Sequence, residues 1–151
     1  MTAVQVIKDP KVPDFCRKTP YSAGYDLYNI EGDMLLNPMW KKVVHTGIKV
    51  NMMACPFGTC ALVLPRSGLS SKTELRICNS PGLIDQDYQG EICVIIQNIG
   101  NKAEHIKYLD RIAQLVFLKT ALMSQHTDVT FVDEFKYSTE RGENGFGSTG
   151  R

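Results

Sequence analysis

The chain has 151 residues, of which 43% are hydrophobic, and its 17 basic and 16 acidic residues leave a formal net charge of +1 at pH 7. This is the length of one ordinary domain, and the hydrophobic content is enough to build a core. A net charge near zero creates no global field that would recruit nucleic acid or an anionic membrane, so neither is expected as a partner. Any recognition of phosphate must therefore be local.

The sequence also indicates a compartment. It contains no run of 18 apolar residues, which predicts no transmembrane helix. The first residues, MTAVQVIKDPKVPDF, lack the apolar stretch and the cleavage site of a signal peptide. We therefore expect an intracellular protein, cytoplasmic or nuclear and not secreted. Its cysteines should be free thiols, and the pair Cys55 and Cys60 is a poor zinc site because it lacks a second cluster of ligands.

Alternation of apolar and polar residues with a period of two predicts strands along most of the chain. The predicted strands are 41–52, 60–65, 91–97, 111–118 and 126–132. One short helix is expected in SGLSSKTEL (67–75), with Ser67 or Ser70 as its cap. The strand pattern predicts one all-β domain, a jelly roll or distorted β-barrel. We place this domain at residues 1–137, because the segment from about Ser138 has no core pattern.

The first motif that does not look like scaffold is AGYDLY (23–28). Gly24 and Asp26 lie among aromatic residues in a segment that otherwise resembles a strand. Taken alone, Asp26 is best explained by a local turn bond at the start of that strand.

The second motif is LPRSGLSSK (64–72), which follows an apolar strand directly. Arg66 offers a rigid fork of donors, and Ser67 and Gly68 can present backbone N–H groups where a short helix begins. These features suit an anion. A capped helix start with a surface arginine explains the motif about equally well.

The third motif, NSPGLIDQDYQGEI (79–92), has turn-forming residues on both sides of an apolar pair. It predicts a hairpin whose arms are GLID and GEICVII. Asp85 stands at the inner end of an apolar arm, where a carboxylate is partly desolvated and suited to act as a general base. Asp87 is better explained by turn chemistry, and Tyr88 could offer its ring face to a planar ligand.

The last motif is RGENGFGSTG (141–150). Its glycines allow the backbone to approach a ligand closely, and Arg141, Ser148 and Thr149 are residue types that bind phosphate. Phe146, between two glycines, has no local packing partner and could stack on a base. A disordered tail explains the glycines but not Arg141 or Phe146. We therefore predict that residues 138–151 form a flexible lid.

Together and in this order, the motifs resemble those of the trimeric deoxyuridine triphosphate nucleotidohydrolases, the dUTPases. With RIAQLVF (111–117) as the fourth motif, the resemblance spans residues 23–150. Members of this family are jelly-roll β-barrels that use Mg²⁺ to hydrolyse dUTP to dUMP and pyrophosphate, which keeps uracil out of DNA and supplies dUMP for thymidylate synthesis. The resemblance alone implies this substrate, the Mg²⁺ and a homotrimer whose sites are shared between three subunits.

The resemblance also implies a role for each motif. Asp85 would be the catalytic base that deprotonates the attacking water, Tyr88 would pack under the deoxyribose, and Asp26 would support the water shell of the metal. Uracil would be read by Asn79, by the backbone of Gly82, Leu83 and Ile84, and by the returning strand near Cys93. The phosphates would be held by Arg66, Ser67, Gly68 and Gln114, and the lid would be closed by Arg141, Phe146, Gly147, Ser148 and Thr149.

Two positions depart from the family pattern. Leu109 occupies the usual glycine position before the fourth motif, which predicts a different turn there without removing Gln114 from the site. Pro81 fixes φ and removes an N–H donor from the third motif, so uracil affinity falls if that N–H normally contacts the base.

Two other functions stay open from the sequence. A dCTP deaminase of the same fold is one; its zinc type is excluded because H-x-E with P-C-x-x-C is absent, and DQDYQG with the full lid favours dUTP over the zinc-free type. The other is a regulatory protein that only binds dUTP. Loss of a catalytic residue would favour it, and Asp85, Arg66, Arg141 and Phe146 are all present.

Overall fold

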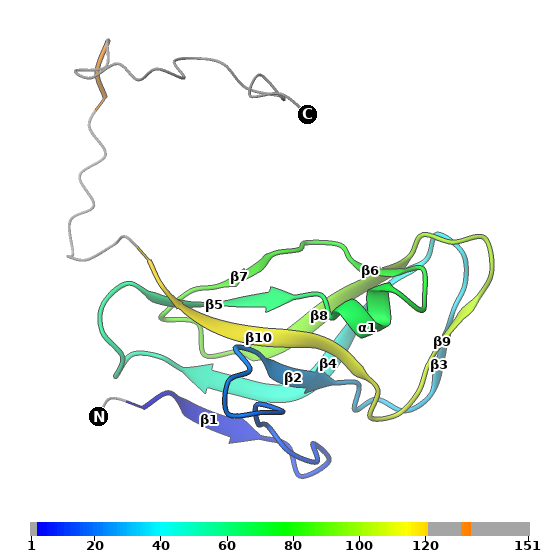
Figure 1. Ribbon diagram of the computed structural model, residues 1–151, viewed down its shortest axis with the longest axis horizontal. Coiled ribbons are helices and arrows are strands. Elements are labelled where there is room, and N and C mark those ends of the chain that lie inside the picture. The colour runs from blue at the N-terminus through cyan, green and yellow to red at the C-terminus, as the bar shows by residue number, and fades with distance from the viewer. Residues whose placement is uncertain (1–2, 121–130, 134–151) are drawn as a thin grey trace.

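The computed structural model of this protein describes residues 3–120 and 131–133. These residues form an all-β sandwich with one helical turn, as the sequence predicts (Figure 1). No helix in these ranges is long and apolar enough to cross a membrane. The elements are β1 (Gln5–Lys8), β2 (Tyr25–Tyr28), β3 (Met34–Leu36), β4 (Lys41–Asn51), β5 (Thr59–Leu64), α1 (Ser67–Ser70), β6 (Leu75–Ile77), β7 (Gly82–Ile84), β8 (Glu91–Asn98), β9 (Glu104–Ile106) and β10 (Arg111–Lys119).

The strands form two four-stranded sheets and a ribbon. One sheet has the order β1-β4-β8-β6, the other has the order β2-β10-β5-β7, and β3 pairs with β9 in the ribbon. Neighbouring strands are antiparallel throughout these sheets. Because sequence neighbours often lie in different sheets, the chain crosses between the layers repeatedly, as in a jelly roll.

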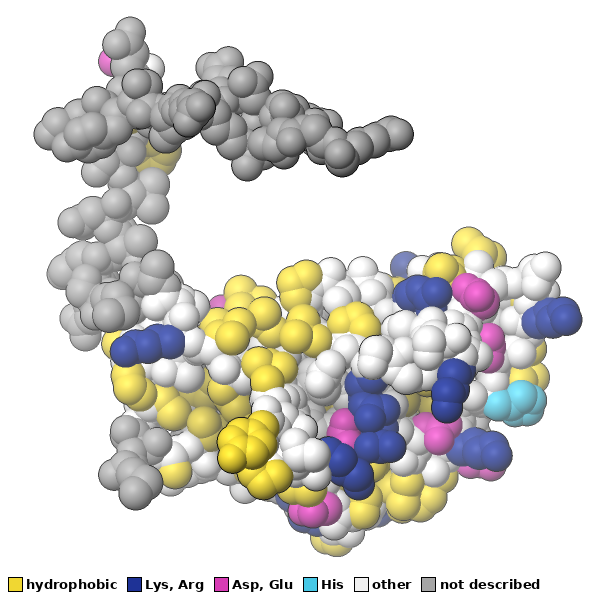
Figure 2. Space-filling model, viewed as in Figure 1, with side chains coloured by type: hydrophobic (Ala, Val, Ile, Leu, Met, Phe, Trp, Pro, Cys, Tyr) yellow, Lys and Arg dark blue, Asp and Glu magenta, His cyan; other side chains and the backbone are white. Residues whose placement is uncertain are grey.

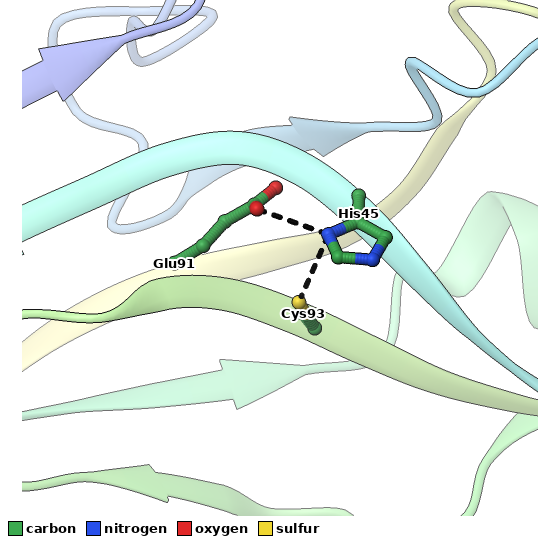
Figure 3. Close-up of side chains that lie close together, drawn as sticks. All are labelled: His45, Glu91 and Cys93. Atoms are coloured by element: carbon green, nitrogen blue, oxygen red, sulfur yellow. Dashed lines mark hydrogen bonds and ion pairs between the residues drawn. The ribbon is translucent and has the colours of Figure 1, made fainter.

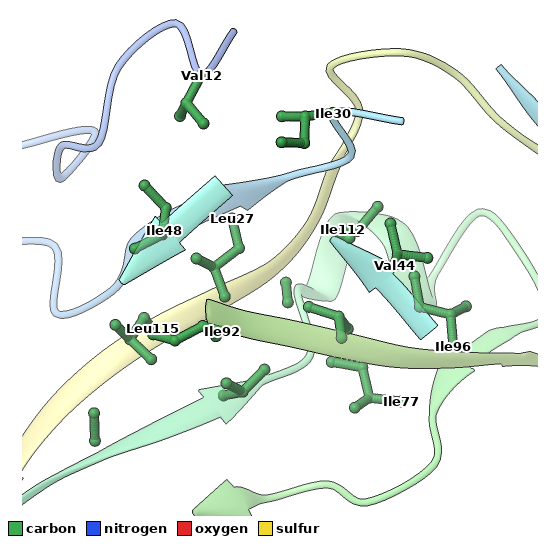
Figure 4. Close-up of a cluster of buried hydrophobic side chains, with 14 of the residues drawn as sticks. Val12, Leu27, Ile30, Val44, Ile48, Ile77, Ile92, Ile96, Ile112 and Leu115 are labelled. Carbon is green, nitrogen blue, oxygen red and sulfur yellow. The ribbon is translucent and has the colours of Figure 1, made fainter. Parts of the chain in front are cut away.

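The core fills the space between the sheets. β8 shows the period of two most clearly, since Ile92, Val94 and Ile96 are buried and the residues between them are more exposed. Figure 4 shows Ile92 and Ile96 among core side chains from β4, β2 and β10. Burying each such side chain contributes roughly 1.5–3 kcal/mol.

Four of the predicted strands are present, with ends within a residue or two of those expected. They are β4, β5, β8 and β10. Most of the predicted strand 126–132 lies outside the described residues, and its described end, Phe131–Val132, is not a strand. All five cysteines are free, as predicted.

The predicted hairpin of the third motif is wrong in one respect, because its two arms do not pair with each other. β7 pairs with β5 in one sheet, whereas β8 pairs with β4 and β6 in the other. The side chain of Gln86 fixes the connection, since its Nε2 donates to the carbonyls of Met52 and Cys55 at 3.1 and 3.2 Å. Its Oε1 accepts a bond of 3.1 Å from the Gly58 N–H. The arms are therefore held by a neighbouring loop.

The turn before β10 contains Leu109 in a left-handed conformation, with φ of 64°. Hydrogen bonds fix this turn, since the Leu109 N–H donates to Asn29 O at 2.8 Å and the Asn29 N–H donates to Asp110 O at 2.9 Å. An L-residue with a Cβ atom pays about 1–2 kcal/mol for this backbone, whereas glycine adopts it freely. The site therefore favours glycine although leucine occupies it.

We expect the Leu109→Gly variant to be more stable than Leu109→Ala by about 1 kcal/mol. Both variants lose the packing of the leucine side chain, and they differ only in the Cβ atom. At an ordinary backbone position the glycine variant is less stable than the alanine variant, so we expect the opposite order here. Urea unfolding of both variants at one protein concentration measures the difference. The ordinary order would show that the turn relaxes without a left-handed residue.

Candidate active site

Three of the motifs meet beside α1, where β2 and β5 end and the antiparallel β10 begins. Gln114 of β10 lies opposite Asp26 of β2 on one side and opposite Leu64 of β5 on the other. Arg66 follows two residues after Leu64, at the start of α1. The register of this sheet therefore brings together residues that are up to 88 positions apart, counted from Asp26 to Gln114.

A β-bulge orients the two polar side chains of β10. The pairing of β10 with β2 shifts between Arg111 and Ala113, and the consecutive residues Ile112 and Ala113 are both buried. Arg111 and Gln114, three positions apart, consequently both face the surface. Arg111 was not among the predicted site residues. The two adjacent apolar residues in RIAQL, which break the period of two, were the signal that could have found it.

Asp26 is the centre of the site. It is only 8% exposed, and its Oδ1 accepts a bond of 2.8 Å from Arg66 Nε while its Oδ2 accepts one of 3.1 Å from Arg111 Nη1. Arg66 Nη1 also donates to the Arg111 carbonyl at 3.5 Å. Burial raises the pKa of the nearby Tyr28 phenol, and the negative charge of Asp26 adds to this rise. One buried carboxylate thus orients two arginines.

A cavity of about 170 Å³ lies over this network. Three of its lining residues are basic and one is acidic, so the cavity attracts an anion. Figure 2 shows basic side chains grouped around acidic ones on this face. A larger hollow of about 560 Å³ elsewhere has mainly apolar walls. The cavity is lined by Lys18, Ser22, Gly24, Asp26, Arg66, Ser67, Gly68, Arg111 and Gln114.

Gly24 and Gln114 approach each other closely beside this cavity. A Cβ atom at Gly24 would lie 2.4 Å from Gln114 Oε1, which is closer than real contacts allow. Gln114 Nε2 donates to Pro65 O at 2.8 Å, and this bond ties β10 to the start of α1. Position 24 of the first motif is therefore glycine because a larger residue would collide with Gln114 of the fourth motif.

The helical turn α1 begins differently from the prediction. Its N-cap is Arg66 and makes no side-chain capping bond, so the expected cap at Ser67 or Ser70 is wrong. The first helical bonds are donated by Leu69 and Ser70 to Arg66 O. The amides of Ser67 and Gly68 precede this ladder and border the cavity, as the anion-site interpretation requires. The arginine side chain cannot cap because a guanidinium has only donors, and here its Nε donates to Asp26 instead.

Asp85 lies at the other end of the sheet. Ile84, the last residue of β7, pairs with Ala61, near the start of β5, whereas Arg66 follows the opposite end of β5 (Figure 1). Arg66 is five positions after Ala61, which corresponds to roughly 16 Å along a strand. Within one chain Asp85 is exposed, and the expected partial desolvation is not found, because the residue lies beyond the paired part of β7.

The other residues of the third motif form a compact group. The Tyr88 hydroxyl donates to Glu91 O at 2.9 Å, and a Cβ atom at Gly90 would lie 2.4 Å from that hydroxyl oxygen. Tyr88 therefore depends on a glycine at position 90. A Cβ atom at Gly82 would lie 3.4 Å from Asn79 Nδ2, and the Ser80-Pro81 peptide bond between them is cis. Leu83 is 60% exposed.

Cys93 lies on β8 in the opposite sheet from β7. Because Ile92 and Val94 face the core, the Cys93 side chain points to the outer face. Its Sγ lies 3.6 Å from His45 Nδ1 (Figure 3). The structure thus places this thiol beside a histidine, and only the strand backbone connects it with the loop that carries Asp85.

The predicted lid residues Arg141, Phe146, Gly147, Ser148 and Thr149 lie outside the described residues, as does the boundary between 1–137 and 138–151. Among the described residues, the first, second and fourth motifs line the cavity. The third motif lies elsewhere on the same chain.

The residues that line the cavity suit a Mg²⁺ ion that is bound to a polyphosphate rather than directly to the protein. Asp26 is the single carboxylate in the lining, and each of its oxygens already accepts a bond from an arginine. Mg²⁺ prefers several oxygen ligands and retains its waters. An ion chelated by a bound polyphosphate, with its waters near Asp26, agrees with this donor set. An ion held directly by the protein does not.

A family model described as dUTPase matches residues 10–150 of the chain. The deoxyuridine 5'-triphosphate nucleotidohydrolase of Clostridium novyi (strain NT) is 42% identical over 128 residues, covering 85% of this chain and 84% of the relative. The protein of the same name from Tolumonas auensis is 44% identical over 134 residues, covering 88% and 84%.

Solved structures give the same result. A mutant dUTPase of Staphylococcus bacteriophage 80alpha, with dUpNHpp, has a TM-score of 0.84 and 28% identity, and the match covers 100% of both chains. A mutant dUTPase from phage phi11 of S. aureus, described as revealing the coordination of a structural Mg(II) ion, has a TM-score of 0.72 and 25% identity. That match covers 89% of this chain and 99% of the other.

Proposed function

Because this chain belongs to the dUTPase family, we propose that it hydrolyses dUTP to dUMP and pyrophosphate by attack of water on the α-phosphorus. The observation that carries this proposal is the network in which Arg66 and Arg111 share the buried Asp26 beside a basic cavity. Such a network holds cationic donors in fixed positions toward a polyanion.

Phosphate binding follows from the cavity. Attack at phosphorus needs the charge of the triphosphate to be neutralised, and positioned arginines do this without reorganising during the reaction. Arg66, Arg111 and Lys18 supply positive charge, and the Ser67 and Gly68 amides supply neutral donors. Gln114, whose amide nitrogen is bonded to Pro65 O, can direct its side-chain oxygen toward a water or a donor of the substrate.

Mg²⁺ is proposed as the cofactor. When bound to the phosphates it would neutralise charge and orient them. Asp26 would contact the waters of the ion, since its carboxylate is the only acidic group of the cavity lining.

Selection of deoxyuridine is assigned to the third motif. The hydroxyl end of the Tyr88 ring is held by its bond to Glu91 O and lies close against Gly90, so the ring would form a wall for a deoxyribose. Asn79 and the backbone at Gly82, Leu83 and Ile84 would pair with the uracil edge. A site built from fixed polar groups rejects cytosine because the wrong base leaves those groups unpaired.

The position of the proposed base Asp85 is the reason to propose an active site shared between subunits. Asp85 is exposed and lies at the end of β5 opposite Arg66, so one chain does not surround a substrate with both residues. A homotrimer in which one subunit supplies the Arg66 cavity and a second supplies the Asp85 loop would complete the site. The third would supply the lid of residues 138–151.

Mixed trimers test this arrangement. Arg66→Ala and Asp85→Asn chains should each be inactive alone, and co-expression should restore about a quarter of the wild-type activity, because random assembly gives that share of sites with both residues intact. Each variant alone, with its trimer confirmed by sedimentation, is the control. No recovery in mixed trimers would place Arg66 and Asp85 of one site in the same chain.

Pyrophosphate release from dUTP, dCTP, dTTP and UTP, with Mg²⁺ or with EDTA, tests the substrate. Release from dUTP alone, lost with EDTA, is expected. Ammonia release from dCTP would indicate the deaminase. Binding of dUTP without hydrolysis would indicate the regulatory protein. The family and the nucleotidohydrolase names of the relatives favour neither alternative.

A further inference from the structure

A second cluster of reactive side chains lies on the outer face of the sheet β1-β4-β8-β6. His45 of β4 and Cys93 of β8 are directly opposite in the register, and Glu91 is two residues before Cys93 on the same face. One ligand atom from each residue lies within 4.8 Å of the other two. In Figure 3, the Glu91 carboxylate and the Cys93 sulfur both point toward the same ring nitrogen of His45.

We propose that His45, Glu91 and Cys93 bind a zinc-class divalent ion that cross-links β4 and β8. Imidazole, thiolate and carboxylate are the three ligand types that Zn²⁺ combines. Mg²⁺, in contrast, prefers oxygen ligands and is excluded by this set. The site is therefore distinct in chemistry from the phosphate cavity, in which none of the described lining residues carries a thiol or an imidazole.

The spacing of the ligand atoms agrees with a tetrahedral ion. With metal–nitrogen and metal–sulfur distances of about 2.0 and 2.3 Å, the edge between the two ligands is roughly 3.5 Å. The observed separation of His45 Nδ1 and Cys93 Sγ is 3.6 Å. His45 Nδ1 and Glu91 Oε2, at 2.9 Å, need to separate by about half an ångström, which follows when the proton between them leaves.

The carboxylate is held in place by the backbone. The register of β4 and β8 shifts between His45 and Lys49, and within this bulge the Gly47 N–H donates to Glu91 Oε1 at 2.8 Å. Glu91 Oε2 is left to face His45 Nδ1. Hydrogen bonds of this kind orient metal ligands and are a regular part of such sites.

The three side chains also influence one another's protonation. The hydrogen bond that Glu91 accepts from His45 raises the pKa of His45, and burial raises the pKa of the Cys93 thiol. Burial opposes the charged form of Glu91, but the bonds from His45 and Gly47 outweigh it and lower the pKa of Glu91. An incoming ion would displace the protons of His45 and Cys93 into solvent. A cavity of about 370 Å³ is lined by His45 and Glu91 among other residues, so solvent reaches two of the three ligands.

Titration with Co²⁺ in the absence of nucleotide tests the proposal, because a thiolate-bound Co²⁺ ion has visible d–d and near-ultraviolet charge-transfer bands. The full chain should bind one Co²⁺ per protomer, and Zn²⁺ should displace it while excess Mg²⁺ should not. Cys93→Ser, His45→Gln and Glu91→Gln should each weaken binding by at least about 100-fold, since loss of even an outer hydrogen bond costs about 10–100-fold. The last variant retains an oxygen acceptor for the Gly47 N–H.

Cys78→Ser is the matched control. Cys78 is also an exposed thiol, and its hydrogen-bond partner is Gln97 Oε1 at 3.9 Å rather than a histidine or carboxylate. This variant should bind Co²⁺ as the unmodified chain does. The proposal is overturned if the unmodified chain binds no Co²⁺, if Cys93→Ser binds it unchanged, if Cys78→Ser loses it, or if Mg²⁺ displaces it. None of these results depends on hydrolysis of dUTP.

Discussion

The Asp85→Asn variant is expected to hydrolyse dUTP about 10²–10⁴-fold more slowly than the unmodified protein, the range typical for loss of a general base. Asparagine has nearly the same shape and can still contact a water molecule, but it cannot accept the proton. The phosphate cavity, which lies at the opposite end of β5, is unchanged. Affinity for dUTP should therefore stay within a few-fold of the original.

The measurement is kcat from pyrophosphate release, together with the Kd of a non-hydrolysable dUTP analogue. Asp87→Asn is the matched control, because Asp87 is another exposed carboxylate two residues further along the same loop. Its kcat should be close to that of the unmodified protein. Equal losses in both variants would assign the effect to the charge of the loop, and an active Asp85→Asn variant would remove Asp85 from the role of base.

The Asp26→Asn variant is expected to lose about 2–3 kcal/mol of the free energy of unfolding as well as most of its activity. Removing one partner of a buried ion pair typically costs about 3–5 kcal/mol, and the cost is lower here because both arginines are partly exposed. The asparagine amide keeps one acceptor oxygen, so it can satisfy only one of Arg66 and Arg111. The other guanidinium then meets an N–H₂ group and loses its fixed position.

Chemical unfolding measures the loss of stability, and the KM for dUTP measures the loss of phosphate binding. Glu31→Gln is the control, because it removes a carboxylate that contacts Lys42 at 3.6 Å on the surface. Such a surface pair contributes roughly 1 kcal/mol or less. If Asp26→Asn were as stable as this control and bound dUTP normally, the network would not be what holds the arginines.

Local pattern predicted much of the fold. The strands β4, β5, β8 and β10 have long stretches in which apolar residues alternate, because each buries one face against the opposite sheet. The short strands β3, β6 and β9 escaped prediction for the same reason, since they have three residues each and show no period. β7 is equally short and was expected only as an arm of the third-motif hairpin. The sequence also did not indicate which strands pair with each other. The two arms of the third motif, for example, were expected to pair but lie in different sheets.

The candidate site was predicted in part. The family resemblance implied Asp26, Arg66 and Gln114 as site residues, and they line one cavity. The local turn bond that the first motif alone suggested for Asp26 is not what the structure shows, because its carboxylate accepts bonds from Arg66 and Arg111. Arg111 was missed because strict alternation does not allow for a bulge. Gln86 was missed because its partners are backbone carbonyls of a loop more than 30 residues earlier. A side chain that satisfies distant backbone groups has no local signature in the sequence.

The sequence by itself determined the β class, the positions of the long strands and the chemical character of each motif, since these depend on neighbouring residues. Only the tertiary structure decided which motifs meet. Antiparallel register placed Asp26 beside Gln114 and His45 beside Cys93, and it left Asp85 at the far end of β5 from Arg66. Register is set by the burial of whole strand faces, so a pairing between residues 48 positions apart, such as His45 and Cys93, has no local cause.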